Sequence, residues 1–355
     1  MEKRKAGILF GGVSSEHEVS LKSAAAVVRN LPSEKYEAVL IGITRDGRWF
    51  RYSGGVDEIE NGAWEKSPEL LPAFISPDSA VHGLVTLLPD GRYETERLDL
   101  VFPVLHGRGG EDGTMQGLLT LAGIPYVGCG VLASAVCMDK AVTNALLDYF
   151  GVAHAPWVMT TRRELAQFEQ LAPAWEQKLG YPMFVKPANA GSSVGITKAH
   201  SREELRSALD LAFRHDFKAV IEKNIAGKEL ECSVLGNHDP QVSVVGEILS
   251  ANEFYDYDAK YNNAASRTLI PANITEAQQQ EMRAEAARAY RALGCEGLAR
   301  VDFLLEESTG RLYLNEPNTI PGFTSISMYA KMWDAAGIPF SELIDRLFEL
   351  ALERG

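Results

Sequence analysis

Two carboxylates and an amide in this sequence are spaced so that they could share a ligand. Asp302 lies in one apolar run, and Glu316 and Asn318 lie at the end of the next. Carboxylates that face each other across strands repel, so such a pair calls for a cation between them. Carboxylate and amide oxygens suit magnesium or manganese better than zinc, and magnesium commonly keeps positions for phosphate oxygens. With Arg300 nearby, the pattern predicts a metal–phosphate site, and a hairpin face with its charges in water is the alternative.

An antiparallel hairpin would position these side chains. Two apolar runs, residues 301–305 and 312–315, flank a polar segment that ends in glycine. A uniform ladder around a turn centred on Thr309 places the two carboxylates opposite each other and Arg300 opposite Asn318. Because side chains alternate along a strand, all four would lie on one face.

Two glycine-rich turns predict a second group of ligand contacts. One begins at Gly11, after the apolar run 6–10, and the loop 106–113 follows another buried run. Both precede helical patterns, and ligands in parallel sheets bind beyond the carboxyl ends of the strands. Glu16 could hold a cationic group there, and we favour ligand contact for His106. The alternatives are an exposed glutamate that favours the helix dipole and a structural histidine.

The character of the chain changes near Gly128, and we expect a domain boundary at about residue 134. Residues 133–150 predict one long helix that carries Lys140. Lys186 lies at the base of a small-residue hairpin tip, 187–195, whose backbone amides could cover phosphates, although its spacing is not that of a P-loop. A mobile surface turn is the alternative.

Three later segments complete the candidate site. Residues 219–223 predict an apolar edge strand whose backbone could hold a purine, with Glu229 placed for its ribose. The aromatic and charged segment 253–261 resembles a lid, with Lys260 and Tyr261 as the residues that point inward. Residues 323–328 predict the start of a helix with Ser325 or Ser327 near its cap, and such a helix end with hydroxyls can bind a carboxylate.

Composition excludes several classes of protein. The chain has 355 residues, 46% of them hydrophobic, and a formal charge of −13, which argues against nucleic-acid binding. We expect no signal peptide and no membrane span. The cysteines lack metal-site spacing and predict reduced, buried thiols in a cytoplasmic protein; they are Cys129, Cys137, Cys232 and Cys295.

Taken together, these pieces resemble the D-alanine–D-alanine ligases of the ATP-grasp superfamily over nearly the whole chain. The most specific runs, in order, are GGVSSEHEVS, HGRGGEDGTMQG, CMDK, FVKPANAGSSVGI, EFYDYDAKY, GLARVDF and LNEPNTIPGFTS. The resemblance implies an α/β fold with an N-terminal Rossmann-like parallel domain, 1–134, and a two-lobed ATP-grasp domain, 135–355. The lobes would comprise a smaller central one, 135–215, and a larger one, 216–355.

The resemblance also implies ATP, two Mg²⁺ or Mn²⁺ ions, and a role for each site residue. It assigns the metals to Asp302, Glu316 and Asn318, and substrate binding to Glu16, His106, Arg300 and Ser327. The implied catalytic set is Glu16, Ser192, Tyr261, Arg300, Gly322 and Ser327. The implied ATP contacts are Lys140, Lys186, Ser192, Glu222, Lys223, Asn224, Ile225, Glu229, Lys260, Asn315 and Glu316.

The implied reaction has two steps, through a D-alanyl phosphate, and serves peptidoglycan precursor synthesis. The resemblance also implies a homodimer that acts on D-alanine and ATP, without nucleic acid or membrane partners. Pro317 and Ile326 depart from the pattern that many members show. Three alternatives stay open: a relative of the vancomycin-resistance type that makes D-Ala-D-Ser or D-Ala-D-lactate, a different ATP-grasp ligase, and a non-catalytic nucleotide-binding module.

Overall fold

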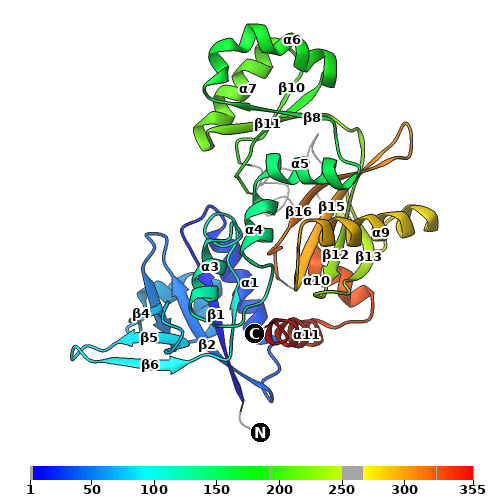
Figure 1. Ribbon diagram of the computed structural model, residues 1–355. Coiled ribbons are helices and arrows are strands. Elements are labelled where there is room, and N and C mark those ends of the chain that lie inside the picture. Colours follow the sequence, from blue (N-terminus) through cyan, green and yellow to red (C-terminus); the bar gives the residue numbers. More distant parts are fainter. Residues whose placement is uncertain (1–2, 192–193, 250–266, 325, 355) are drawn as a thin grey trace.

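The computed structural model describes residues 3–191, 194–249, 267–324 and 326–354 (Figure 1). Within these residues the strands form sheets of seven, four and five strands. Figure 1 shows the seven-stranded sheet in the N-terminal part, the four-stranded sheet in a separate lobe at the top, and the five-stranded sheet between them.

The N-terminal sheet has the strand order β6-β5-β4-β3-β2-β1-β7. Strand β1 pairs in parallel with β2 and β7, while β3 to β6 extend the sheet antiparallel. The segment between β2 and β7 is therefore short-stranded. The strands are β1 (Arg4–Gly11), β2 (Tyr36–Ile43), β3 (Trp49–Tyr52), β4 (Leu71–Ile75), β5 (Gly83–Leu87), β6 (Tyr93–Arg97) and β7 (Leu100–Pro103).

Helices cover both faces of this sheet, and one of them comes from the far end of the chain. Helix α3 (Thr114–Leu121) packs on one face, while α1 (His17–Arg29) and the C-terminal α11 (Phe340–Leu352) pack on the other. Phe348 of α11 contacts the rings of Tyr36 and Phe102 edge-to-face. Burying these aromatic rings fixes the C-terminal helix against the N-terminal sheet.

The four-stranded sheet has the order β10-β9-β11-β8 and is covered by α6 (Phe168–Leu179) and α7 (Arg202–His215). Its strands are β8 (Trp157–Thr161), β9 (Met183–Pro187), β10 (Thr197–Ala199) and β11 (Lys218–Lys223). Because β11 pairs with both β9 and β8, it is an inner strand, and the prediction of an edge strand here is wrong. Strand β11 extends this sheet to Lys223, beyond the limit at residue 215 that was predicted for the smaller lobe.

The five-stranded sheet has the order β14-β13-β12-β15-β16, and α9 and α10 pack against it. Strand β16 is an edge strand. Proline cannot donate a hydrogen bond to a neighbouring strand, so Pro317 is tolerated at the edge of the sheet. The elements are β12 (Gly227–Leu235), β13 (Gln241–Leu249), β14 (Arg267–Leu269), α9 (Glu276–Ala292), β15 (Leu298–Glu306), β16 (Leu312–Asn318) and α10 (Met328–Ala335).

The predicted single helix over 133–150 is wrong. The chain forms α4 (Val131–Met138) and α5 (Lys140–Phe150), with a break at Asp139, whose φ is −91° and ψ is 98°. The Asp139 carboxylate accepts hydrogen bonds from the amides of Ala141 and Val142, both at 3.1 Å. Asp139 therefore caps α5, and Lys140 is the first residue of this second helix.

Candidate active site

The β15–β16 hairpin brings the predicted metal ligands together. Asp302 pairs directly with Glu316, and Arg300 pairs with Asn318, so the predicted register at the site is confirmed. A bulge between Asp302 and Phe303 shifts the ladder by one residue toward the turn. The prediction of a uniform ladder is therefore wrong, because the two-residue alternation is interrupted once between the turn and the site.

The Arg300 guanidinium holds this cluster in place. Its Nε donates to Oδ1 of Asp302 at 2.7 Å and its Nη2 to Oδ2 at 2.8 Å, and Nε lies 3.2 Å from Oε2 of Glu231. Asn318 Nδ2 also donates to Asp302 Oδ2, at 2.9 Å. Burial would lower the pKa of Arg300, but Asp302 and Glu231 outweigh it and raise that pKa well above its ordinary value. Arg300 therefore stays charged in the site.

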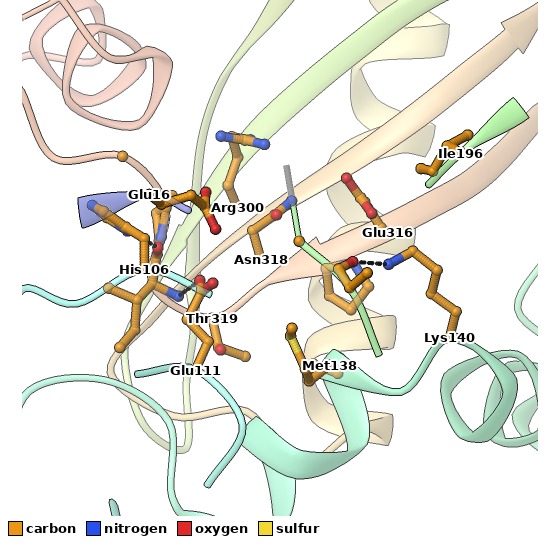
Figure 2. A pocket seen from close by; sticks show the side chains of 17 residues that line it. Glu16, His106, Glu111, Met138, Lys140, Ile196, Arg300, Glu316, Asn318 and Thr319 are labelled. Atoms are coloured by element: carbon orange, nitrogen blue, oxygen red, sulfur yellow. Dashed lines mark hydrogen bonds between the residues drawn. The ribbon is translucent and has the colours of Figure 1, made fainter. Parts of the chain in front are cut away.

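A polar cavity of about 100 Å³ lies where the N-terminal part meets the hairpin. It is lined by loops from distant parts of the sequence, and its small volume and polar lining suit a small polar molecule. Figure 2 labels ten of its lining residues: Glu16, His106, Glu111, Met138, Lys140, Ile196, Arg300, Glu316, Asn318 and Thr319.

Glu16 lies at the N-terminal side of this small cavity and is 8% exposed. A Cβ built at Gly107 would lie 2.6 Å from Glu16 Oε2, and one built at Gly191 would lie 2.9 Å from the same atom. A side chain at either glycine would therefore displace the Glu16 carboxylate from its present position. The alternative of an exposed glutamate is therefore wrong, and Glu16 presents its carboxylate at the cavity.

His106 lines the same cavity but also ties two loops together. Its Nδ1 lies 3.0 Å from the carbonyl oxygen of Ile320, and its Nε2 lies 3.1 Å from Oγ of Ser23. Burial lowers the pKa of His106, partly opposed by the Glu16 carboxylate. The imidazole is thus neutral, bridging α1 to the loop that follows β16.

Glu111 is a lining residue that the sequence analysis did not single out. Its Oε2 accepts from the amide of Gly107 at 2.7 Å, and its Oε1 accepts from the amide of Ile320 at 3.1 Å. Burial, together with the charge of Glu16, raises the pKa of Glu111 to about 8. Glu111 could have been predicted from its position four residues after Gly107, in a loop that follows a buried strand.

Gly322 and Ser327 lie at the other side of the small cavity. Gly322 belongs to its lining, and a Cβ there would lie 3.2 Å from Oγ of Ser327. Ser327 precedes α10 and accepts from the Thr324 amide at 3.0 Å. The predicted start of a helix at residue 323 is wrong, because the helix begins at Met328, which leaves Ser327 as its N-cap residue.

A second cavity of about 320 Å³ lies between the four-stranded and five-stranded sheets. Lys186 Nζ lies 2.6 Å from Oε2 of Glu222 and donates to Asn315 Oδ1 at 3.3 Å. Burial would lower the pKa of Lys186, but Glu222 and Glu316 outweigh it and raise the pKa. The predicted ATP contacts that line this cavity are Lys186, Glu222, Lys223, Asn224, Ile225, Glu229, Asn315 and Glu316.

Lys140 lies in the small cavity instead, where its Nζ donates to the carbonyl oxygen of Ala190 at 2.8 Å (Figure 2). Glu316 lines both cavities, so the two meet at this carboxylate. Four predicted residues lie outside the described part of the chain, as does the predicted lid 253–261: Ser192, Lys260, Tyr261 and Ser325.

The oxygen atoms that the hairpin presents are suitable ligands for the predicted divalent ions. Asp302 and Glu316 face each other on one side of the sheet, and Asn318 adds an amide oxygen, all hard donors. No cluster of three or more His, Cys, Asp or Glu side chains suited to a metal occurs among the described residues. Two carboxylates and an amide therefore need further oxygen ligands, and nucleotide phosphates could supply them.

The architecture defines the class of protein. Two antiparallel sheets hold a nucleotide-sized cavity between them, and an N-terminal α/β domain closes a small polar cavity beside it. This is the ATP-grasp fold, which solved D-alanine–D-alanine ligases share. The solved VanG D-Ala:D-Ser ligase from Enterococcus faecalis matches with a TM-score of 0.90 and 42% identity, covering 99% of this chain and 100% of its own.

The chain belongs to the D-alanine–D-alanine ligase family. Family models for the D-ala D-ala ligase N-terminus and C-terminus match residues 5–129 and 146–349. The D-alanine–D-alanine ligase of Thermoanaerobacter sp. (strain X514) is 51% identical over 99% of this chain and 98% of its own. The D-alanine-D-alanine ligase from Coxiella burnetii matches with a TM-score of 0.85 and 34% identity, covering 100% of this chain and 95% of its own.

No helix in the described ranges has the length and apolar character needed to cross a membrane.

Proposed function

We propose that this chain is an ATP-dependent ligase that joins two D-alanines into D-alanyl-D-alanine for peptidoglycan precursor synthesis. The observation that carries the proposal is the position of Glu316, which lines both the nucleotide-sized cavity and the small polar one. A γ-phosphate in the first cavity would therefore face an amino-acid carboxylate in the second. Membership in the ligase family supports the same reaction.

In the first step, a carboxylate oxygen of the first D-alanine attacks the γ-phosphorus, ADP leaves, and D-alanyl phosphate forms. Glu16 binds the ammonium group of this substrate in the small cavity. Lys140 and Lys186, with Lys260, offset the charge on the phosphates. Residues 222–225 lie along the adenine and Glu229 takes the ribose.

In the second step, the amine of the second D-alanine attacks the acyl carbon, and inorganic phosphate leaves. Arg300 and the Gly322 amide stabilise the tetrahedral oxyanion, because both line the small cavity. Ser327 binds the carboxylate of the second substrate beside Gly322. Ser192 and Tyr261 join Glu16 in closing the site, since D-alanyl phosphate hydrolyses in water.

Asp302, Glu316 and Asn318 would hold two Mg²⁺ or Mn²⁺ ions. When bound, the ions neutralise charge that develops on the phosphates. Because the protein supplies few ligands, we expect Mg²⁺ to bind weakly alone and at least tenfold more tightly with ADP. Calorimetric titration with and without ADP measures this difference, and equal affinities would contradict the assignment.

D-Serine is the strongest alternative second substrate, since the VanG D-Ala:D-Ser ligase aligns over nearly the whole chain. The 51% identity to the D-alanine–D-alanine ligase of Thermoanaerobacter sp. (strain X514), against 42% to VanG, favours D-alanine. Incubation with ATP, D-alanine and each of D-alanine, D-serine and D-lactate tests the choice by product mass. We expect D-Ala-D-Ala to dominate, and a preference for either competitor would overturn it.

We further propose that the chain forms a homodimer in the cytoplasm and divides into domains 1–134 and 135–355, with the smaller lobe running to Lys223. The described cysteines are free thiols, as expected in a reducing compartment. Sedimentation at micromolar concentration should give twice the mass of the chain, and a monomer would contradict the dimer.

A further inference from the structure

Asn144 is a buried polar residue on α5 that neither the sequence analysis nor the proposed reaction uses. It is 4% exposed, and its Nδ2 donates to Oε1 of Glu222 at 3.0 Å. The other oxygen of Glu222 lies 2.6 Å from Nζ of Lys186. Glu222 therefore has one oxygen held by an amide and the other by an ammonium group.

Three side chains, those of Asn144, Glu222 and Lys186, connect helix α5 to the nucleotide-sized cavity. Glu222 and Lys186 line the nucleotide-sized cavity, whereas Asn144 stands behind them on α5. Glu222 and Lys186 lie on neighbouring strands β11 and β9, and α5 packs against β11. An ionised carboxylate accepts hydrogen bonds only, so the amide must present its N–H to it.

We propose that Asn144 is a positioning residue for nucleotide binding, which acts by holding the Glu222 carboxylate and thereby the Lys186 ammonium group. With Oε1 occupied by the amide, Lys186 pairs with Oε2 of Glu222 and Oδ1 of Asn315 and keeps one N–H donor for a phosphate oxygen. Without the amide, the buried Oε1 lacks that donor, and the ammonium group shifts to bridge both oxygens. The nucleotide then meets a lysine turned toward Glu222.

This inference rests on the proposed function in one respect, the assignment of Lys186 to a nucleotide phosphate. It goes beyond that function, since it names a residue outside the cavity that sets nucleotide affinity. It also distinguishes Asn144 from its neighbour Thr143, which is 3% exposed and donates to the Val136 carbonyl at 2.7 Å. Thr143 is as deeply buried as Asn144, but it contacts α4 instead of the Glu222 carboxylate.

The test compares Asn144→Leu, which keeps the number and branching of the heavy atoms and removes the donor, with Thr143→Val, which also removes one buried hydrogen bond. We expect Asn144→Leu to raise the KM for ATP and the Kd for ADP about tenfold, with kcat changed less than about threefold. Asn144→Asp should be worse, because it places a second carboxylate beside Glu222. Thr143→Val should leave nucleotide affinity within about twofold.

A double-mutant cycle on ADP affinity separates positioning from a general loss of packing. In a Glu222→Gln background, Asn144→Leu should weaken ADP binding less than about twofold, because its partner is already altered. The same tenfold loss in both backgrounds, or no loss in either, would overturn the proposal. If the unmodified enzyme forms no ADP in response to D-alanine, the proposed function fails instead, and the ADP affinities still decide the role of Asn144.

Discussion

The two cavities that meet at Glu316 are built in different ways. In the small cavity, the contacts join loops far apart in the sequence: Glu111 reaches the amide of Ile320, and His106 reaches the carbonyl of the same residue. In the nucleotide-sized cavity, side chains on neighbouring strands pair with one another, as Lys186 does with Glu222. One cavity depends on how the N-terminal domain docks, and the other on pairing within and between the two lobes.

This difference indicates which substitutions should alter amino-acid binding without altering nucleotide binding, and which should do the reverse. In the small cavity, side chains hold the backbone groups of distant loops, so a change in loop shape should alter its affinity for D-alanine. Charged side chains hold the larger cavity, so a change in charge should alter its affinity for ATP. A residue that lines both should affect the two together.

Glu316→Gln should have the largest effect, because Glu316 lines both cavities and would hold the metal ions. We expect ADP formation to fall on the order of 10³-fold, since a metal ligand supports several kcal/mol of charge stabilisation. Thermal unfolding should change little. Glu342→Gln, which removes an exposed pair with Arg346, is the matched control and should retain full activity. Undiminished turnover in Glu316→Gln would refute the metal assignment.

Glu111→Gln tests the loop-built cavity through the pH dependence of stability. The pKa of Glu111 is raised from 4.5 to about 8, so between these values the folded chain holds a proton that the unfolded chain has lost. The free energy of unfolding therefore falls as pH rises through this window, with a ceiling of ~1.4 kcal/mol per pH unit for one group. The variant should lose this slope.

Urea unfolding of both proteins at pH 5 and pH 8 measures the effect. The advantage of the unmodified chain over Glu111→Gln should shrink by roughly 2 kcal/mol between the two values, well under the ceiling for one group. A difference that stays constant with pH would show that Glu111 keeps its ordinary ionisation in the fold.

Gly322→Ala should have a smaller effect, confined to the amino-acid side. The added Cβ would lie 3.2 Å from Ser327 Oγ, and it would crowd the proposed site for the second substrate. We expect the KM for the second D-alanine to rise about tenfold, a loss of ~1.4 kcal/mol, with the KM for ATP within about twofold. Initial rates with each substrate varied in turn measure both constants.

Gly55→Ala provides the control for this substitution. Gly55 has a φ of −77° and no heavy atom within 4 Å of an added Cβ, so alanine fits without strain. Its kinetics should match those of the unmodified chain. If Gly322→Ala changed the KM for ATP instead, the two cavities would not be separable as described.

The sequence predicted the hairpin well, because alternation and a short turn fix which residues face each other. Asp302 opposite Glu316 followed from these local rules and is confirmed. The break at Asp139 was missed, since the apolar period runs on through it while the capping carboxylate acts locally. The pairing of Asn144 with Glu222 depends on how α5 packs against β11, which no local pattern encodes.

Transfer of an isotope tests the central claim, that a γ-phosphate at Glu316 is passed to an amino-acid carboxylate. D-Alanine labelled with ¹⁸O in its carboxylate is incubated with ATP and Mg²⁺, and the released phosphate is analysed by mass. Because the carboxylate oxygen that attacks phosphorus leaves with the phosphate, we predict one ¹⁸O atom in the phosphate for each dipeptide formed. Dipeptide accompanied by unlabelled phosphate would contradict the account.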